Sequence, residues 1–450
     1  MKSKGYAAAE TAKRDQFRSP GSSRSRHAAS GERSNSTAKN VGEVLAVAAV
    51  PALCVLAYLG TGSLPLLLSG AVILVGFLSG IGVPRWRPVD LAVLLVLLYE
   101  APSLLLSRYP SNGLRGATAL LAAALLYILV RLVAGGSRQI ALIAVLVGVG
   151  GVVLAGFALI QFNQQVHLLN ANGLTDIVAF RARLVVPPAP WVLGEWFTLM
   201  LLTLPFAFAA PVLLWLDRRR MLAAVAAAMP ICVSSGLLLS CSRAVFWAVI
   251  VFAVVAVAMA AVYRTIRTKV ALIAITGAFS VLGLVLATEN VFYPGVAEAY
   301  TGQHTSQIRS TEGRLSIWKR SADVFRLSPA WGVGGGNAQL FLTSNANEEE
   351  TTGFASRTFS LPIQVLTEKG TIGALLYLAV LALAGWEAHR KLRNLRISPQ
   401  TKALTCCLAA GLIAVLFREL TYSSLLEHSA TTMLLATSLA FLAAEETACA

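Results

Sequence analysis

The sequence predicts an all-helical protein that crosses a membrane about twelve times, and two observations support this fold class. Hydrophobic residues make up 56% of the 450 residues and charged residues only 13%, whereas a soluble protein carries about 25% charged residues. The apolar residues also gather in runs of about 17–25 residues, long enough for a helix to cross roughly 30 Å of hydrocarbon. A single membrane domain over residues 43–446 is therefore expected.

A basic tail precedes this domain. Residues 1–42 are rich in Ser, Gly, Ala and Arg, contain nine Lys or Arg residues and lack apolar periodicity, so a disordered cytoplasmic segment is expected. The formal net charge of the whole chain is +15. Because no basic face on a soluble module accompanies that charge, nucleic acid is not an expected partner. The expected partner is membrane lipid.

The apolar runs define twelve candidate membrane-spanning segments. They are residues 43–61, 64–83, 89–107, 116–135, 139–162, 192–215, 221–241, 243–263, 270–288, 371–389, 403–420 and 430–446. With the N-terminus in the cytoplasm, 24 of the 37 Lys and Arg residues fall in the tail or in cytoplasmic loops. The opposite orientation would move all of them across the membrane, against the positive-inside rule. The sequence thus predicts a multi-pass protein of the cytoplasmic (inner) membrane, with both termini, including the short tail 447–450, in the cytoplasm.

Two long loops then fall on the outer side, at residues 163–191 and 289–370. The larger one contains a polar segment, residues 310–337, that lies between apolar runs and is expected to carry the active groups. Four of its apolar residues follow one another at helical spacing and predict one apolar face of a short helix: Leu315, Trp318, Ala322 and Phe325. Pro329 is expected to end that helix.

Arginine dominates the charged side chains expected outside. The outward arginines include Arg181, Arg183, Arg243, Arg309, Arg314, Arg320, Arg326 and Arg357. A guanidinium group stays charged and donates two parallel hydrogen bonds to phosphate. No carboxylate cluster, catalytic triad or Walker-type loop accompanies the arginines, so neither metal nor cofactor is expected. Such a site suits a lipid-linked diphosphate, because fixed donors stabilise the charge of a departing diphosphate.

Arg243 and Arg314 are the principal candidates in this set. Arg243 lies in the short hairpin SCSRA at the outer membrane edge, where an arginine is costly unless it is paired or snorkels toward water. Trp318 follows Arg314 by one helical turn and either stacks on sugar or anchors the loop, with Arg320 beside it. The backbone N–H of Gly334 either contacts phosphate or belongs to a simple turn.

Two ionisable residues lie deep in the predicted spans. Glu100 precedes Pro102 in the third span, and Arg418 lies near the outer end of the eleventh. A pair between Glu100 and Arg418 would neutralise both groups inside the bundle. The alternative is that they lie along the path of the substrate.

Three segments of the chain form a recognisable set: SCSRAVFWAVIV, GRLSIWKRSADVFRLSPAWGVGGGN and LPIQVLTEKGTIGALLYLAVL. Together they resemble the O-antigen ligase and polymerase family of bacterial surface-polysaccharide enzymes, and the resemblance extends over roughly residues 190–440. It implies a membrane glycosyltransferase of cell-envelope and lipopolysaccharide biosynthesis that moves a glycan from a polyprenyl diphosphate to a hydroxyl of a lipid, polysaccharide or protein acceptor. In that reaction Arg243 and Arg314 would bind the diphosphate. Both ligase and polymerase activities fit the resemblance.

The catalytic base is left open by one departure from the family pattern. The family usually has His-Asn before the third segment, and this chain has Phe359 and Ser360 there. His304, His428 and Glu368 are the candidates for accepting the proton of the acceptor hydroxyl.

Two other functions compete with glycosyl transfer. A transporter or flippase for an anionic lipid or solute would also use outward arginines. Such proteins are often built from two related halves with paired broken helices near the midplane, and no internal repeat is apparent here. A family member that has lost catalysis is the second alternative.

Overall fold

The structure is a computed structural model in which helices form nearly all of the described part of the chain. The description covers residues 85–107, 109–134, 137–171, 191–238, 242–263, 305–344, 360–421 and 429–444, with short pieces near 47–53, 68–73, 185–186, 358 and 425. The predicted tail 1–42, the predicted span 270–288 and most of the first two predicted spans lie outside these residues.

The described helices follow the predicted order. They are α3 (Pro88–Leu105), α4 (Pro110–Val133), α5 (Ser137–Ala171), α7 (Leu193–Leu216), α8 (Arg220–Ala226), α9 (Ala228–Leu238), α10 (Arg243–Val262), α13 (Thr305–Leu327), α14 (Ala338–Ser344), α15 (Leu361–Arg393), α16 (Pro399–Glu419) and α17 (Ser429–Ala443). The strands β1 (Val185–Val186) and β2 (Trp191–Val192) form one short antiparallel pair. The predicted all-helical class is confirmed.

Eight helical segments in the described residues are long and apolar enough to cross a membrane, with α8 and α9 together forming one of them. The last helix, α17, has only 15 residues, fewer than the roughly 20 that a span needs. A multi-pass membrane protein is therefore supported. The predicted total of twelve depends on segments outside the described residues and stays a prediction.

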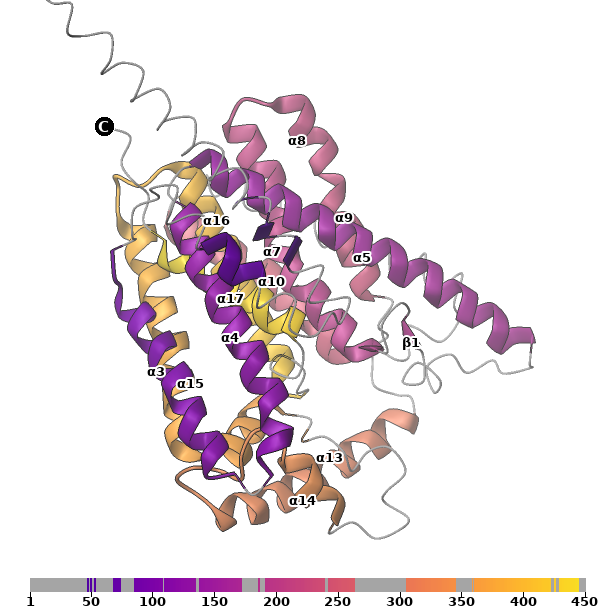
Figure 1. The fold of residues 1–450 in the computed structure, drawn as a ribbon. Helices are drawn as coiled ribbons and strands as arrows, with labels where there is room; N and C mark the ends of the chain where they lie inside the picture. Colours follow the sequence, from indigo (N-terminus) through magenta and orange to yellow (C-terminus); the bar gives the residue numbers. More distant parts are fainter. Residues whose placement is uncertain are drawn as a thin grey trace, which may run out of the picture.

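Two helices differ from the expected segments. Helix α5 has 35 residues and is therefore roughly 52 Å long, so part of the predicted outer loop 163–191 is helical. Figure 1 shows α5 running obliquely beyond its neighbours. The predicted span 221–241 is interrupted at Ala227, between α8 and α9. Pro230 accounts for the interruption because it has no N–H to donate to the preceding turn.

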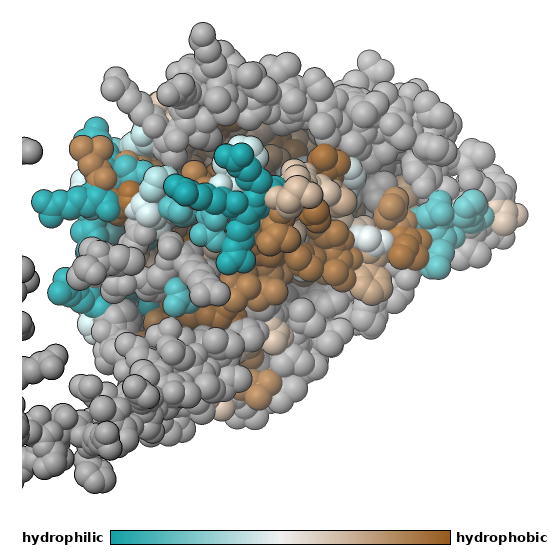
Figure 2. All heavy atoms as spheres, turned by 90° about the horizontal axis from the view of Figure 1, so that it is seen from above, coloured by the Kyte–Doolittle hydropathy of each residue, from teal (hydrophilic) through white to brown (hydrophobic). Residues whose placement is uncertain are grey.

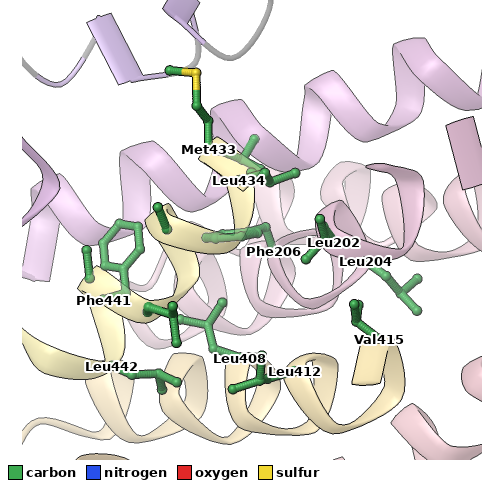
Figure 3. Close-up of a cluster of buried hydrophobic side chains, with 14 of the residues drawn as sticks. Leu202, Leu204, Phe206, Leu408, Leu412, Val415, Met433, Leu434, Phe441 and Leu442 are labelled. Atoms are coloured by element: carbon green, nitrogen blue, oxygen red, sulfur yellow. The ribbon is translucent and has the colours of Figure 1, made fainter. Parts of the chain in front are cut away.

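Helix α7 lies at the centre of the packed core. It packs against α5, α9, α16 and α17, and the contact with α16 and α17 is formed by leucine and phenylalanine side chains (Figure 3). Phe206 of α7 meets Phe441 of α17 edge to face, with ring centroids 6.0 Å apart. Gly411 of α16 allows close approach, because a Cβ there would lie 2.0 Å from the ring of Pro205. Such small residues let helices pack tightly in a membrane.

One end of the bundle gathers basic residues. Helix α8 and the connection between α15 and α16 lie at the upper end in Figure 1, whereas α13 and α14 lie at the lower end. Figure 2 views the molecule from this upper end and shows hydrophilic residues next to hydrophobic ones. There Arg131 is buried and pairs with Asp90 at 3.0 Å, and its guanidinium also donates to the carbonyl oxygens of Arg85 and Ala443. These bonds tie α3, α4 and the end of α17 together.

Candidate functional site

The candidate site is organised by a break in α15. Gly370 has φ 63° and ψ −169°, a conformation that is essentially confined to glycine. The break divides α15 into a first half, residues 361–369, and a second half, residues 371–393. Carbonyl groups before the break and N–H groups after it lose their helical partners. In an apolar bundle each such group costs several kcal/mol unless it finds another partner.

The partners come from the glycine loop, residues 328–337, which connects α13 to α14. Two of its N–H groups donate to carbonyls before the break, and two of its carbonyls accept from N–H groups after it. The four bonds are Val333 N to Thr367 O (3.0 Å), Gly334 N to Glu368 O (2.9 Å), Thr371 N to Pro329 O (2.8 Å) and Ile372 N to Ala330 O (3.2 Å). The loop and the break therefore complete each other.

Glycine is required where the two backbones touch. A Cβ on Gly332 would lie 2.3 Å from the carbonyl carbon of Glu368, and a Cβ on Gly370 would lie 2.4 Å from the oxygen of Ala330. Both residues also have positive φ angles. The N–H of Gly334 is committed to Glu368, so it is not available for the phosphate contact expected from the sequence.

An aromatic pair anchors the glycine loop to α3. The rings of Tyr99 and Trp331 stack with centroids 5.7 Å apart and an interplanar angle of 4°. The Tyr99 hydroxyl donates to the carbonyl of Lys369 at 2.5 Å and lies 3.2 Å from that of Trp331. Tyr99 thus fastens both sides of the break.

Asn337 fixes the other end of the loop. Its side chain is fully buried, and its Nδ2 donates to Ser107 Oγ at 2.5 Å and to the carbonyl of Val333 at 3.0 Å. Its Oδ1 accepts from Asn112 Nδ2 at 3.1 Å. The final asparagine of the second motif therefore ties the loop to the turn between α3 and α4.

A buried ion pair lies beneath this loop. Lys369 Nζ is 2.5 Å from Glu100 Oε2, and the two side chains are 10% and 7% exposed. The predicted pairing of Glu100 with Arg418 is therefore wrong. The sequence placed Lys369 in an outer loop, but the first half of α15 folds back against α3 and brings the ammonium group inside the bundle.

Arg418 instead has partners at the junction of α16 and α7. Its guanidinium is 2.6 Å from Glu419 Oε1 and also donates to Thr198 Oγ1. Glu419 in turn accepts from the Leu425 N–H at 3.1 Å. Because Arg418 is only 2% exposed, this arrangement favours a structural role over the substrate contact expected from the sequence.

Glu368 is also enclosed by protein groups. Its buried carboxylate accepts hydrogen bonds from the backbone N–H groups of Gly336 and Ala338 and from the side chain of Gln364. These bonds hold the start of α14 against the first half of α15. The geometry favours a positioning role for Glu368 over proton transfer.

Helix α13 carries the predicted arginine and tryptophan, but its buried face differs from the expected one. From residue 313 to the end of α13, Leu315 and Ala322 are exposed, and the buried residues are Ile317, Ser321 and Val324. Ile317 and Val324 lie two turns apart and pack against Val333 and Leu342, with the small Ser321 between them. The apolar spacing predicts the wrong face because the buried face includes a polar residue, Ser321.

The rotation of α13 leaves the key side chains of its motif half-buried. Arg314, Trp318 and Arg320 all have intermediate exposure. The indole Nε1 of Trp318 donates to the carbonyl of Thr358 at 3.0 Å, which orients its ring beside the start of α15. Arg243 is half-buried as the first residue of α10.

The described packing gives the two principal arginines different neighbours. Helix α10 packs chiefly on α16, and α13 packs on α15 and α14. A shared diphosphate site for Arg243 and Arg314 thus stays a prediction. Arg181, Arg183, His304, His428 and Phe359 lie outside the described residues.

Sequence reasoning missed three residues that build this site. Tyr99, Asn337 and Lys369 were not singled out, although Asn337 ends the second motif and Lys369 lies within the third. A polar residue that recurs inside a glycine-rich motif is the signal that could have found Asn337. No local pattern marks Tyr99, because its partners are 232 and 270 residues away.

A pair of glycine substitutions on α15 tests the break. Gly370→Ala should destabilise the protein by more than about 1–3 kcal/mol, because it combines a disfavoured backbone conformation with a clash. Gly385→Ala is the matched control, since a Cβ there meets no atom within 4 Å, and it should stabilise by roughly 0.5–1 kcal/mol. Thermal melting of the purified protein measures both changes. Equal melting temperatures for the two variants would show that the break does not need glycine.

A double-mutant cycle tests the buried ion pair. Glu100→Leu leaves the Lys369 ammonium buried without its counterion and should cost about 3–5 kcal/mol. The double variant Glu100→Leu/Lys369→Met removes both charges and should be less destabilised than the sum of its two single variants. Chemical denaturation in detergent gives the coupling energy. Strict additivity would mean that the two charges do not interact.

Comparison with known proteins supports the relationship suggested by the motifs. Residues 228–378 match a family model described as O-antigen ligase. The matched interval contains Arg243, Arg314, the glycine loop and the break at Gly370. No curated protein matches the chain.

The family match indicates an O-antigen ligase- or polymerase-type membrane glycosyltransferase, a class that acts in polysaccharide and lipopolysaccharide biosynthesis. The matched region is narrower than the roughly 190–440 expected from the sequence, but it includes most of the three motifs. The predicted resemblance is confirmed: over residues 228–378 the chain is O-antigen ligase-like.

Proposed function

We propose that the protein transfers a glycan from a polyprenyl diphosphate carrier to an acceptor hydroxyl, as a surface-polysaccharide ligase or polymerase. The observation that carries this proposal is the O-antigen ligase match over residues 228–378, because it includes both candidate arginines and the loop that builds the site. The acceptor is a lipid, a polysaccharide or a protein.

In the proposed reaction the acceptor oxygen attacks the anomeric carbon of the glycan. A bond forms between that oxygen and the carbon, the bond from the carbon to the diphosphate oxygen breaks, and the diphosphate leaves with the electron pair. Arg243 and Arg314 stabilise the negative charge that develops on the leaving group. Arg243 is well suited to this role because it begins a 20-residue helix, whose N-terminus carries a partial positive charge.

Four other predicted residues, Arg181, Arg183, Trp318 and Arg320, would support binding of the substrate. Arg320 adds positive charge on α13, and Arg181 and Arg183 would add more from the other outer loop. Trp318 offers an oriented aromatic face for sugar. Since Glu368 is enclosed by backbone groups, we assign the acceptor's proton to His304 or His428 and a positioning role to Glu368.

Arginine substitutions test the assignment. With purified protein and a lipid-linked oligosaccharide, Arg243→Ala and Arg314→Ala should each lower kcat/KM by roughly 10²–10³-fold, as expected for loss of a donor to a developing charge. Arg326→Ala is the matched control on α13, because Arg326 is 76% exposed and pairs with Asp323. Release of polyprenyl diphosphate is the readout, in buffer with and without a chelator, which should not change the rate.

The same assay identifies the base and tests the alternatives. Replacement of the true base, His304 or His428, should cost about 10²–10⁴-fold in rate. Full turnover in both arginine variants would remove them from the mechanism. Uptake of labelled lipid into proteoliposomes without any glycosyl transfer would support the transporter instead.

The orientation of the bundle is part of the proposal. We place the end with α13 and α14 outside, because the opposite end carries the basic connections that the positive-inside rule assigns to the cytoplasm. Two exposed leucines mark these ends: Leu327 at the end of α13 is 67% exposed, and Leu395 between α15 and α16 is 92% exposed.

Cysteine labelling tests this orientation. In a variant without the six native cysteines, Leu327→Cys should react with a membrane-impermeant thiol reagent on intact cells. Leu395→Cys should react only after the membrane is permeabilised. The reverse pattern would place the candidate site in the cytoplasm and overturn the proposal.

A further inference from the structure

An apolar groove lies beside the broken helix and is not explained by the arginines. It encloses about 390 Å³, within the range of about 300–1,000 Å³ that small-molecule sites occupy. Helices α3, α4, α15 and α17 form its walls, and the end of α16 contributes to its rim. Helices α3, α4 and α15 are each long and apolar enough to cross a membrane.

The lining of the groove is almost entirely hydrocarbon. Valine, leucine and alanine side chains make up most of it, and Tyr127, Tyr377 and Thr432 are the only residues with side-chain polar atoms among the described residues that line it. A lining with three hydroxyl groups and no charged side chain offers few partners for a charged or sugar group. Its rim is open, because Leu378 and Leu420 are 60% and 51% exposed. The groove therefore fits a flexible hydrocarbon chain that enters from the side.

The outer end of the groove reaches the candidate site. Leu361 and Pro362, at the start of α15, line this end. Thr358, just before them, accepts the indole N–H of Trp318. Helix α13 is thereby held beside the mouth of the groove, and it carries five basic and two acidic residues. A lipid lying in the groove would present its anionic head to this basic helix.

We propose that the groove binds the isoprenoid chain of the lipid diphosphate next to its head group. This deepens the proposed function and depends on it for the identity of the chain. The groove gains little from removing hydrocarbon from water, because the chain comes from the bilayer, whose tails are as apolar as leucine. Its contribution is to position the anomeric carbon by packing, which makes the shape of the lining decisive.

A filling substitution in the groove tests the proposal. Ala374 of α15 lines the groove and is half-buried, so Ala374→Phe should fill it. Ala382 lies two turns further along the same helix, is exposed and is not part of the lining, so Ala382→Phe is the matched control. Full-length protein in phospholipid nanodiscs is incubated with a long-chain polyprenyl diphosphate that carries a photoactivatable group in its first isoprene units.

In the wild-type protein the photolabel should be found in peptides containing residues 374–381 or 432–439. Ala374→Phe should reduce this labelling roughly tenfold, the size of effect expected from one misfitting group in an apolar pocket. Ala382→Phe should label like the wild type. Melting temperatures of the variants show whether each is folded, and the position of the label in the wild type tests the proposal without any variant.

Each remaining outcome decides the matter. Label outside the groove, equal labelling of Ala374→Phe, or a groove that retains only bilayer phospholipid would overturn the proposal. Failure of the proposed function is distinguishable. Groove labelling without glycosyl transfer would contradict the proposed function and support chain binding in the groove. Glycosyl transfer that is unchanged in Ala374→Phe would support the function and contradict chain binding in the groove.

Discussion

The structure depends on the need to pair every backbone group at the break in α15. A helix that stops inside an apolar bundle exposes N–H and C=O groups that lipid cannot satisfy. Here the glycine loop supplies four hydrogen bonds across Gly370, and this requirement holds residues 328–337 against the apolar helix α15. The geometry of the site follows from it: α13 and α14, at either end of the loop, are held against the first part of α15.

The side chains around the break reinforce the same constraint. The Tyr99 hydroxyl contacts the backbone of both the loop and α15, and Asn337 ties the loop to the α3–α4 turn. Lys369 pairs with Glu100 beneath the loop. Burying an ion pair is favourable only when its geometry is good, so the pair specifies how α3 and α15 fit together. The first part of α15 also lines one end of the apolar groove. One broken helix thus adjoins the glycine loop, the Tyr99–Trp331 pair and the apolar groove.

Prediction from sequence succeeded where the free energy of membrane insertion depends on local composition. Hydropathy located the eight described segments that are long and apolar enough to cross a membrane, because about 20 apolar residues are needed to cross a bilayer wherever they occur. The motifs indicated the O-antigen ligase-like region, and the family match over residues 228–378 confirms it. It failed for α13, whose buried face includes Ser321, and for Glu100, whose partner is 269 residues away. Burial and pairing are properties of the neighbours that a residue meets, and those neighbours come from distant segments.

The sequence by itself therefore indicated that this protein lies in a membrane, where its apolar helices are and which family it resembles. Only the tertiary structure decided that the glycine run is a structural partner of a broken helix. It also decided that Lys369 neutralises Glu100 and that Arg418 is occupied by Glu419. The physical reason is that membrane insertion sums over single residues, whereas an ion pair or a completed backbone depends on which two segments are brought within about 3 Å of each other.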